Sequence, residues 1–172
     1  MDSKGFDLEA TLTPVNTLSV TLGYSFTDAR VREMKEVKDK ELAELIYGTT
    51  EEQIKNNKQK LNSTEGNYQT LIPKNTFYAY ADYTIPKGIF KNLSFDLSST
   101  YTDKVYRNTA NNRWFDGFWI TDLGAAYRLP NRVRLSVRVN NLFDKSYGNQ
   151  ALGDQWVPSM PRNYQVAISY NL

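Results

Sequence analysis

Charged side chains alternate with aliphatic ones in the stretch RVRLSVRVNN, residues 132–141. In an extended chain, Arg134 and Arg138 share one face and the aliphatic residues share the other. Across a tight turn, Arg128 would lie directly opposite Arg134. Asp122 would then lie diagonal to Arg138. Such a cluster can bind an anionic substrate, or it can stiffen the protein wall and dock another segment, and we favour the second interpretation.

A second set of polar side chains follows directly. Asn140, Asn141 and Asp144 carry the oxygen atoms that a hard cation prefers as ligands. Asn and Asp also close turns and loops by hydrogen bonding to their own backbone, and we favour this capping role over a metal site. Leu142 and Phe143 belong to the same stretch, and we expect Phe143 to pack the loop against the protein wall.

Aromatic rings with neighbouring hydrogen-bond donors occur in two polar stretches, RNTANNRWFDG and GNQALGDQWVP. Flat, rigid rings and donor groups suit a bulky ligand that carries anionic oxygens. The candidates for such a binding site are Arg113, Trp114, Phe115, Gln150 and Trp156. Trp114 could equally anchor the protein at a membrane interface.

The composition excludes several kinds of chemistry. The 172 residues include no His and no Cys, which removes the usual general base, the thiolate nucleophile and the commonest zinc ligands. There is no GxSxG elbow for a nucleophilic serine, so we predict that the protein is not an enzyme. The 21 basic and 19 acidic residues give a net charge of +2, which provides no electrostatic basis for binding nucleic acid.

Seven segments of alternating apolar and polar residues must position these side chains. A period of two is typical of a β-strand with one apolar and one polar face. The segments keep their phase across the short connections, as an antiparallel meander requires. The predicted apolar pairs are Leu12 with Leu18, Ile85 with Leu93, and Leu129 with Val133.

The connections between these segments alternate in length. The short ones are residues 13–17, 86–92 and 130–132, and the long ones are residues 29–73, 103–117 and 141–161. In a meander, every short turn lies at one end of the sheet and every long loop lies at the other end.

The loop at residues 30–73 is predicted to be partly helical. Residues 32–47 place apolar side chains at helical spacing, and Gly48 follows as a candidate C-cap. Thr49 or Thr50 would cap a second helix that has Glu in its first turn. The loop carries eight basic and eight acidic residues, which indicates a solvated excursion.

Aromatic residues on the apolar faces gather near the strand ends, while Leu, Val, Ala and Ile fill the strand centres. Those near the short turns are Tyr83, Phe95, Tyr127 and Tyr170, and those near the long loops are Phe6, Tyr24, Phe26, Phe77, Tyr101, Trp119 and Tyr164. Two aromatic girdles around an aliphatic band are typical of strands that cross a bilayer, because Tyr and Trp prefer the headgroup level. The pattern therefore predicts that the aliphatic faces contact lipid and that the polar faces line a hydrated lumen.

The end of the chain resembles a known family. VNNLFDKSY, residues 139–147, followed by PRNYQVAISYNL, residues 161–172, is similar to the last two strands of TonB-dependent outer-membrane receptors. In that family an NLFDKxY segment leads into the penultimate loop, and PR opens the closing strand. The segments KGFDLEATLTP, LSVTLGYSFTDA, IPKNTFYAYADYTI and DLGAAYRL stand in family-like order upstream, so the resemblance covers nearly the whole chain outside residues 32–68.

The last residues also resemble the signal that the outer-membrane assembly machinery recognises. They are polar Gln165, small Ala167, aromatic Tyr170 and apolar Leu172. The family pattern has a glycine and a terminal Phe where this chain has Ala167 and Leu172. Because Leu172 keeps the outward phase, the resemblance implies weaker but retained recognition.

The resemblance implies an all-β, antiparallel, up-and-down transmembrane barrel in the bacterial outer membrane. Receptors of this kind have about 22 strands and a plug, so we expect residues 1–172 to be the C-terminal part of a larger barrel, with residues 30–73 as an extracellular loop. The implied function is active uptake of a scarce large nutrient, most often a ferric siderophore, with no cofactor bound by this segment. The implied partners are lipid, the rest of the barrel, the plug and, through the plug, the TonB complex.

Two other classes of protein share parts of this pattern. A non-energised outer-membrane pore or a surface adhesin would have the same kind of barrel without energy coupling. A soluble β-sandwich binding module also alternates apolar and polar residues, and a second layer over the apolar face would identify it.

Overall fold

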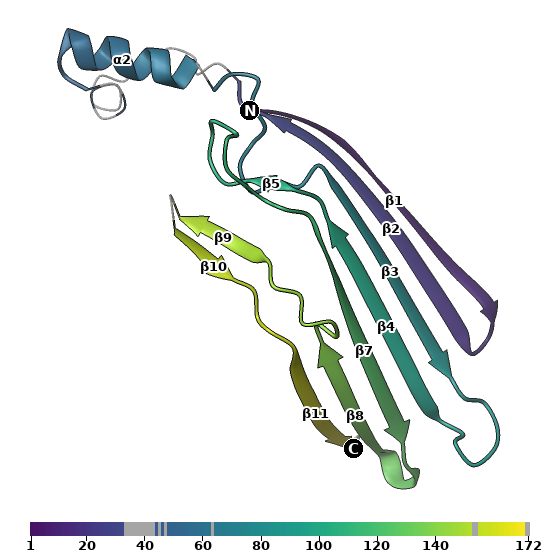
Figure 1. Cartoon of the computed structure of the whole chain (residues 1–172). Helices are drawn as coiled ribbons and strands as arrows, with labels where there is room; N and C mark the ends of the chain where they lie inside the picture. The colour runs from purple at the N-terminus through teal and green to yellow at the C-terminus, as the bar shows by residue number, and fades with distance from the viewer. Residues whose placement is uncertain (33–43, 45, 47, 63, 153–154, 171–172) are drawn as a thin grey trace.

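The computed structural model describes residues 1–32, 44, 46, 48–62, 64–152 and 155–170. Seven strands form one antiparallel sheet whose spatial order follows the chain (Figure 1). They are β1 (Asp2–Val15), β2 (Leu18–Arg30), β3 (Asn75–Thr84), β4 (Leu93–Thr102), β7 (Phe118–Arg128), β8 (Val133–Asn140) and β11 (Asn163–Tyr170). The sheet does not close on itself, because β1 and β11 form its two edges.

The remaining elements lie in the connections. The β4–β7 loop contains the hairpin of β5 (Val105–Tyr106) and β6 (Trp114–Phe115), and the β8–β11 loop contains the hairpin of β9 (Gly148–Leu152) and β10 (Gln155–Pro158). A 3₁₀ turn (Pro130–Arg132) joins β7 to β8, and helix α2 (Glu51–Asn62) belongs to the β2–β3 loop. The three long loops lie at one end of the sheet and the three short turns lie at the other, as predicted (Figure 1).

The strand register keeps the predicted apolar residues on one face. Leu97 of β4 lies opposite Ala81 of β3 and Leu123 of β7, and Leu123 lies opposite Val139 of β8. Because side chains alternate along a strand, this register places the residues next to them in sequence on the other face, where most are polar. The prediction of two chemically distinct faces is confirmed.

Of the three apolar pairs predicted across the short turns, two are confirmed and one is wrong. Ile85 N–H donates to Leu93 C=O at 2.8 Å, and Leu129 N–H donates to Val133 C=O at 2.9 Å, which confirms these two pairs. The predicted pair of Leu12 with Leu18 is wrong, because Leu12 lies opposite Val20. The register shifts around Pro14, which has no N–H to donate, and β1 continues to Val15 opposite Leu18.

The β2–β3 loop contains the second predicted helix. Thr50 Oγ1 accepts a hydrogen bond from Gln53 N–H at 3.2 Å, and Gln53 Oε1 accepts one from Thr50 N–H at 3.3 Å. This reciprocal capping box satisfies donors that the first turn of α2 would otherwise leave free. Before it, Gly48 has φ +91°, and its N–H donates to Glu44 C=O at 2.9 Å. The predicted helix at residues 32–47 lies largely outside the described residues.

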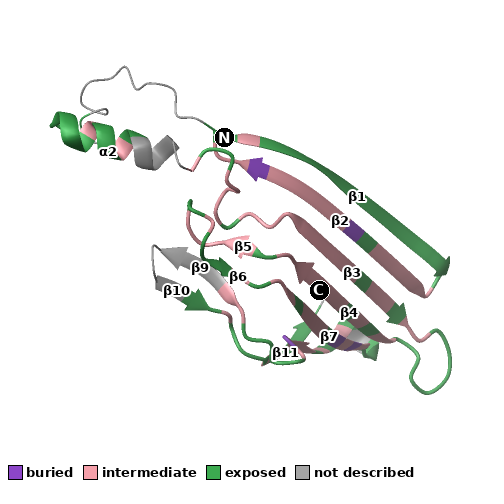
Figure 2. Cartoon of the chain, turned by 45° about the horizontal axis from the view of Figure 1, so that its top comes forward, coloured by how far each residue is buried: buried purple, intermediate pink, exposed green. Residues whose placement is uncertain are grey.

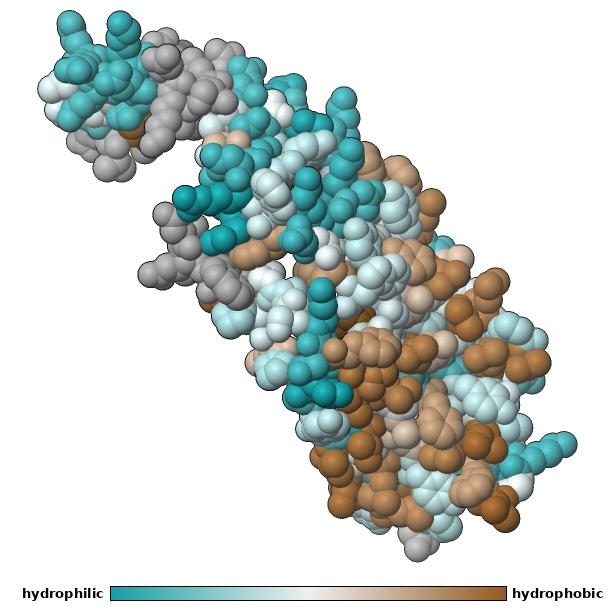
Figure 3. All heavy atoms as spheres, in the orientation of Figure 1, coloured by the Kyte–Doolittle hydropathy of each residue, from teal (hydrophilic) through white to brown (hydrophobic). Residues whose placement is uncertain are grey.

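No second layer covers the sheet within the described part of the chain. Ala29 and Ala126 are the only apolar side chains there that are buried. Figure 2 shows the strands mainly in the colours of intermediate and exposed residues. Large outward-facing residues stay exposed, with Leu8 at 63%, Val137 at 49% and Ile168 at 74%. Figure 3 shows apolar residues gathered over the sheet and hydrophilic residues toward the long loops. The β-sandwich alternative is therefore contradicted, because a sandwich buries its apolar face.

None of the described helices combines the length and the apolar composition that crossing a membrane requires.

Candidate functional site: a vestibule beneath three loops

The polar face of the sheet carries an ion pair that spans three strands. Arg138 of β8 pairs with Asp96 of β4, and Gly124 of β7 lies between them. Asp122 lies diagonal to Arg138, as the predicted register requires, but its carboxylate has other partners. It accepts hydrogen bonds from the Ser98 hydroxyl at 3.3 Å and from the N–H of Asn141, the residue after β8, at 2.8 Å. These contacts join β4, β7 and β8 into one stiff wall.

Three arginines gather at the short-turn end of the same face. Arg128 lies directly opposite Arg134, at the predicted register position. Together with Arg132 they line a cavity of about 290 Å³ that also includes Ser169 of β11. Within the described residues, none of the three forms an ion pair with an acidic side chain. The cavity is therefore suited to a carboxylate from outside this part of the chain.

The stretch after β8 forms a tight, hydrogen-bonded turn. Asn141 has φ +53° and is 6% exposed; its side chain accepts from Lys145 N–H at 2.8 Å and donates to Lys145 C=O at 3.0 Å. Asp144 accepts from Arg162 N–H at 2.7 Å, and Asn140 donates to Asn163 Oδ1 at 2.8 Å. These side-chain atoms are engaged within the protein, which supports the capping role over a cation site.

Phe143 departs from its expected position. It is 75% exposed and does not pack against the sheet. The neighbouring Leu142 bonds through its backbone to β7, because its N–H donates to Thr121 C=O at 2.7 Å. The turn is therefore held by backbone and amide hydrogen bonds rather than by the aromatic ring.

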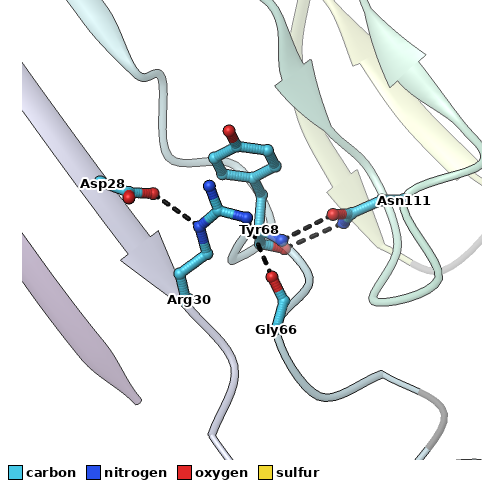
Figure 4. Close-up of polar contacts among 5 residues, drawn as sticks. All are labelled: Asp28, Arg30, Gly66, Tyr68 and Asn111. Carbon is cyan, nitrogen blue, oxygen red and sulfur yellow. Dashed lines mark hydrogen bonds and ion pairs between the residues drawn. The ribbon is translucent and has the colours of Figure 1, made fainter.

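The β2–β3 and β4–β7 loops are tied together by an arginine–tyrosine–asparagine cluster (Figure 4). The Arg30 guanidinium lies 3.8 Å from the ring centroid of Tyr68 and donates to Asp28 at 2.7 Å and to Gly66 C=O at 3.0 Å. Asn111 accepts from Tyr68 N–H at 2.6 Å and donates to Tyr68 C=O at 2.9 Å. One side-chain amide thus bonds both backbone groups of a residue in another loop.

A cavity of about 370 Å³ lies beneath the loops, at the upper end of the polar face. Its floor consists of Thr100 and Thr102 of β4 and of Phe118, Ile120 and Asp122 of β7. Its roof consists of Leu71 and Pro73 from the β2–β3 loop, Val105 from the β4–β7 loop, and Tyr147 and Gly148 from the β8–β11 loop. We call this cavity, defined by these ten residues, the vestibule. All three long loops contribute to it.

The vestibule combines apolar walls with a few polar groups, which is the usual character of a small-molecule site. The rings of Phe118 and Tyr147 stack with centroids 4.0 Å apart, so they form one rigid aromatic surface. The two threonine hydroxyls and the Asp122 carboxylate lie on the same lining. The arrangement can hold a bulky organic molecule through ring contacts and hydrogen bonds.

Sequence reasoning did not identify most of these residues. Phe118 and Ile120 belong to the polar phase of β7, so they break the alternation that the rest of the strand follows. Apolar residues on both faces at the upper end of this strand are the signal that could have revealed them. Tyr147 depends on the fold of the β8–β11 loop, for which strand periodicity carries no information.

The loop residues that the sequence predicts as ligand contacts are not among the ten vestibule residues. Trp114 and Phe115 form β6, where the indole N–H of Trp114 donates to Asp116 at 3.1 Å. Phe115 lies 4.8 Å from the Arg107 guanidinium. Of Arg113, Trp114 and Phe115, none lines the vestibule. Gln150 lies in β9 and Trp156 in β10, and their side chains lie outside the described part of the structure.

The predicted assembly-signal residues lie on β11, at one edge of the sheet. Gln165 lies opposite Arg138, Ala167 lies opposite Ser136, and Tyr170 lies opposite Val133. This register gives Gln165 and Ala167 the polar face and Tyr170 the apolar face, where it is 60% exposed. Leu172 lies outside the described residues.

Among the described residues, no group of three or more acidic side chains lies close enough together to hold a metal ion.

Comparisons with known proteins place the chain in one family. The family model described as TonB dependent receptor-like, β-barrel, matches residues 1–142. The probable TonB-dependent siderophore receptor PiuA of Acinetobacter baumannii is 26% identical over 106 residues, which cover 61% of this chain and 14% of PiuA. The metal-pseudopaline receptor CntO of Pseudomonas aeruginosa is 24% identical over 171 residues, which cover 98% of this chain and 20% of CntO.

Solved structures show the same fold. The crystal structure of PiuA matches with a TM-score of 0.73 and 22% identity, covering 98% of this chain and 21% of PiuA. That of BauA, the ferric preacinetobactin receptor of A. baumannii, matches with a TM-score of 0.70 and 18% identity, covering 98% of this chain and 22% of BauA. The chain thus spans about a fifth of the length of these structures. The chain belongs to the TonB-dependent receptor β-barrel family, whose members are transporters of the outer membrane of Gram-negative bacteria.

Proposed function

We propose that this chain is part of an outer-membrane receptor that actively imports a ferric siderophore. It contributes barrel wall, polar lumen and the three loops that form the vestibule. The observation that carries this proposal is the vestibule itself, because it opens onto the polar face and its roof comes from every long loop. A ligand held there lies at the entrance to the lumen.

The names of the relatives support this ligand class. PiuA is named as a probable siderophore receptor, CntO as a metal-pseudopaline receptor, and a further relative from P. aeruginosa as the ferripyoverdine receptor. Ferric siderophores are bulky chelates, and rigid aromatic surfaces with a few hydrogen-bonding groups suit such molecules.

The proposal includes partners for the rest of the sheet surface. Further strands pair with the free edges of β1 and β11 to close the barrel, because an open sheet edge is not tolerated in a bilayer. A plug docks an acidic group against Arg128, Arg132 and Arg134, and the plug couples the receptor to the TonB complex. Outer-membrane lipid covers the apolar face, and the assembly machinery recognises β11.

Uptake by living cells tests the proposal. A strain that lacks the receptor gene is compared with the parent strain for accumulation of radioactive iron supplied as a panel of ferric siderophores. We expect loss of uptake for one siderophore, and restoration by the full-length gene. Uptake that is unchanged for every siderophore, including hydroxamate, catecholate and mixed types, would contradict the proposed ligand class.

The same assay separates active transport from the alternative of a non-energised pore or adhesin. An active receptor accumulates its ligand above the external concentration and stops when the inner-membrane proton gradient is collapsed. A pore only equalises the two concentrations and is unaffected by the gradient, and an adhesin accumulates no ligand.

A further inference from the structure

The outward face of the sheet changes character toward the long loops. Four aromatic side chains form a row on neighbouring strands; these are Tyr24 of β2, Phe77 of β3, Tyr101 of β4 and Trp119 of β7. The ring of Trp119 lies 5.9 Å from that of Phe77 and 5.1 Å from that of Tyr101. In a membrane strand, such a row marks the level of the lipid headgroups.

A polar, hydrogen-bonded row of Asn75 and Asp103 lies next to the aromatic row on the side of the loops. The Tyr24 hydroxyl donates to Asn75 Oδ1 at 2.8 Å, and Asn75 Nδ2 donates to Asp103 Oδ2 at 2.7 Å. The other carboxylate oxygen of Asp103 accepts from Lys104 N–H at 2.8 Å. Both carboxylate oxygens of Asp103 therefore accept hydrogen bonds that fix the start of the β4–β7 loop next to the aromatic row.

Two ammonium groups lie beside this polar row. Lys74 Nζ lies 5.7 Å from the ring centroid of Phe26 and 5.9 Å from that of Tyr68, and Lys104 Nζ lies 5.2 Å from that of Tyr106. Neither lysine forms an ion pair with any residue that the structure describes. Aromatic faces attract an ammonium group without forming an ion pair with it, so both lysines can still bind an anion.

The two lysines line a common cavity of about 200 Å³, which we call the rim cavity. Its other lining residues are Tyr68, Ile72, Asp103 and Tyr106. Two ammonium groups against one hydrogen-bonded carboxylate leave the lining positive. Lys104 is exposed and Lys74 partly buried, so an anion can approach from outside.

We propose that the rim cavity binds a phosphate group of a lipid in the outer leaflet of the outer membrane. Asp103 of the cavity bonds Asn75, which shares the outward face with Phe26, and Lys74 Nζ lies by the Phe26 ring. The cavity therefore lies just beyond the aromatic row on the lipid-facing side, which is the level of the lipid headgroups. Basic pockets at this depth bind anionic headgroups through charge attraction. The site lies on the opposite face from the vestibule, so it goes beyond the proposed uptake function and does not depend on which ligand is imported.

Native mass spectrometry of the whole purified receptor in neutral detergent tests the site. The probe is bisphosphorylated lipid A, with fully dephosphorylated lipid A as the comparison lipid. The test variant is Lys74→Gln with Lys104→Gln. The matched control is Lys87→Gln with Lys91→Gln, which removes the same charge from the β3–β4 turn at the other end of the sheet. Where the double test variant fails to fold, the exposed single change Lys104→Gln replaces it.

We expect the test variant to bind bisphosphorylated lipid A about tenfold more weakly than the parent receptor, and the control to bind it normally. The dephosphorylated lipid should bind the parent and both variants equally weakly. Equal affinity of the test and control variants for lipid A would overturn the proposal, as would equal binding of the two lipids by the parent. Displacement of lipid A by an equal concentration of inorganic phosphate would assign the cavity to free anions instead.

Discussion

The Arg138 guanidinium reaches across Gly124 to form an ion pair with Asp96, two strands away. A Cβ atom at position 124 would overlap the Asp96 carboxylate, so the absence of a side chain is what lets the two charges meet. Glycine thus has a steric role in the middle of a strand, where its flexibility alone would be unfavourable.

Replacing this glycine should weaken the wall. We expect Gly124→Leu to lower the free energy of unfolding by about 1–3 kcal/mol, because the new side chain displaces the Asp96 carboxylate and separates the ion pair. The measurement is the temperature at which the receptor loses its resistance to unfolding in sodium dodecyl sulfate.

The matched control is Ala125→Leu, one residue further along β7. Residue 125 belongs to the apolar phase of the strand, so the larger side chain extends into lipid. A loss of stability at Ala125→Leu as large as that at Gly124→Leu would contradict the steric explanation.

The two faces of β8 should differ in their tolerance of charge. Val137 lies on the exposed apolar face, and we expect Val137→Arg to cost about 2–4 kcal/mol near the middle of the bilayer. Ser136 lies on the polar face, opposite Ala126 and Ala167, and Ser136→Arg should cost far less. Membrane-inserted receptor, measured on blots of outer-membrane fractions, should fall only for the first variant. Equal amounts of the two variants would show that the faces are wrongly assigned.

The amide of Asn111 should control the coupling of two loops. Because Asn111 bonds both backbone groups of Tyr68, we expect Asn111→Ala to destabilise the contact by about 1–2 kcal/mol. Hydrogen exchange at the Tyr68 amide should then become roughly tenfold faster. Asn112→Ala is the control, since this exposed neighbour bonds Asn108 and, among the residues that the structure describes, no atom of Tyr68. Similar acceleration in both variants would mean that Asn111 does not hold the loops together.

The vestibule residue Tyr147 should contribute more to ligand affinity than Trp114, which the sequence predicts as a ligand contact. We expect Tyr147→Ala to weaken binding of the imported ligand about tenfold or more, because the stacked surface with Phe118 is lost. Trp114→Ala should have a smaller effect, since Trp114 does not line the vestibule. Equilibrium binding to purified receptor measures both. A larger loss at Trp114 would place the ligand on the β5–β6 hairpin.

The fold was largely predictable because membrane strands impose a simple rule on sequence. Period-two alternation assigns Val137 and Arg138 to opposite faces of the sheet, and Pro130 marks the turn after β7. The strand order and the face on which each side chain lies can therefore be predicted from the sequence alone. The shift near Pro14 shows the limit of this rule, because hydrophobic phase alone cannot locate a bulge.

The site was less predictable because its contacts join residues that are not neighbours in the pattern. The Asp96–Arg138 pair skips a strand, and only the missing side chain between the two residues permits it. The vestibule depends on loop conformation, which places Tyr147 over Phe118. The exposure of Phe143 has the same origin, because amide hydrogen bonds fix that turn and leave the ring no packing role.

The free edges of β1 and β11 have a consequence for handling the protein. Each edge presents a row of unpaired peptide groups that can pair with another strand, and the adjoining face of the sheet is apolar. We expect a polypeptide limited to these strands to aggregate through these edges and this face. Biochemical work should therefore start from the closed barrel, in which other strands pair with the edges of β1 and β11.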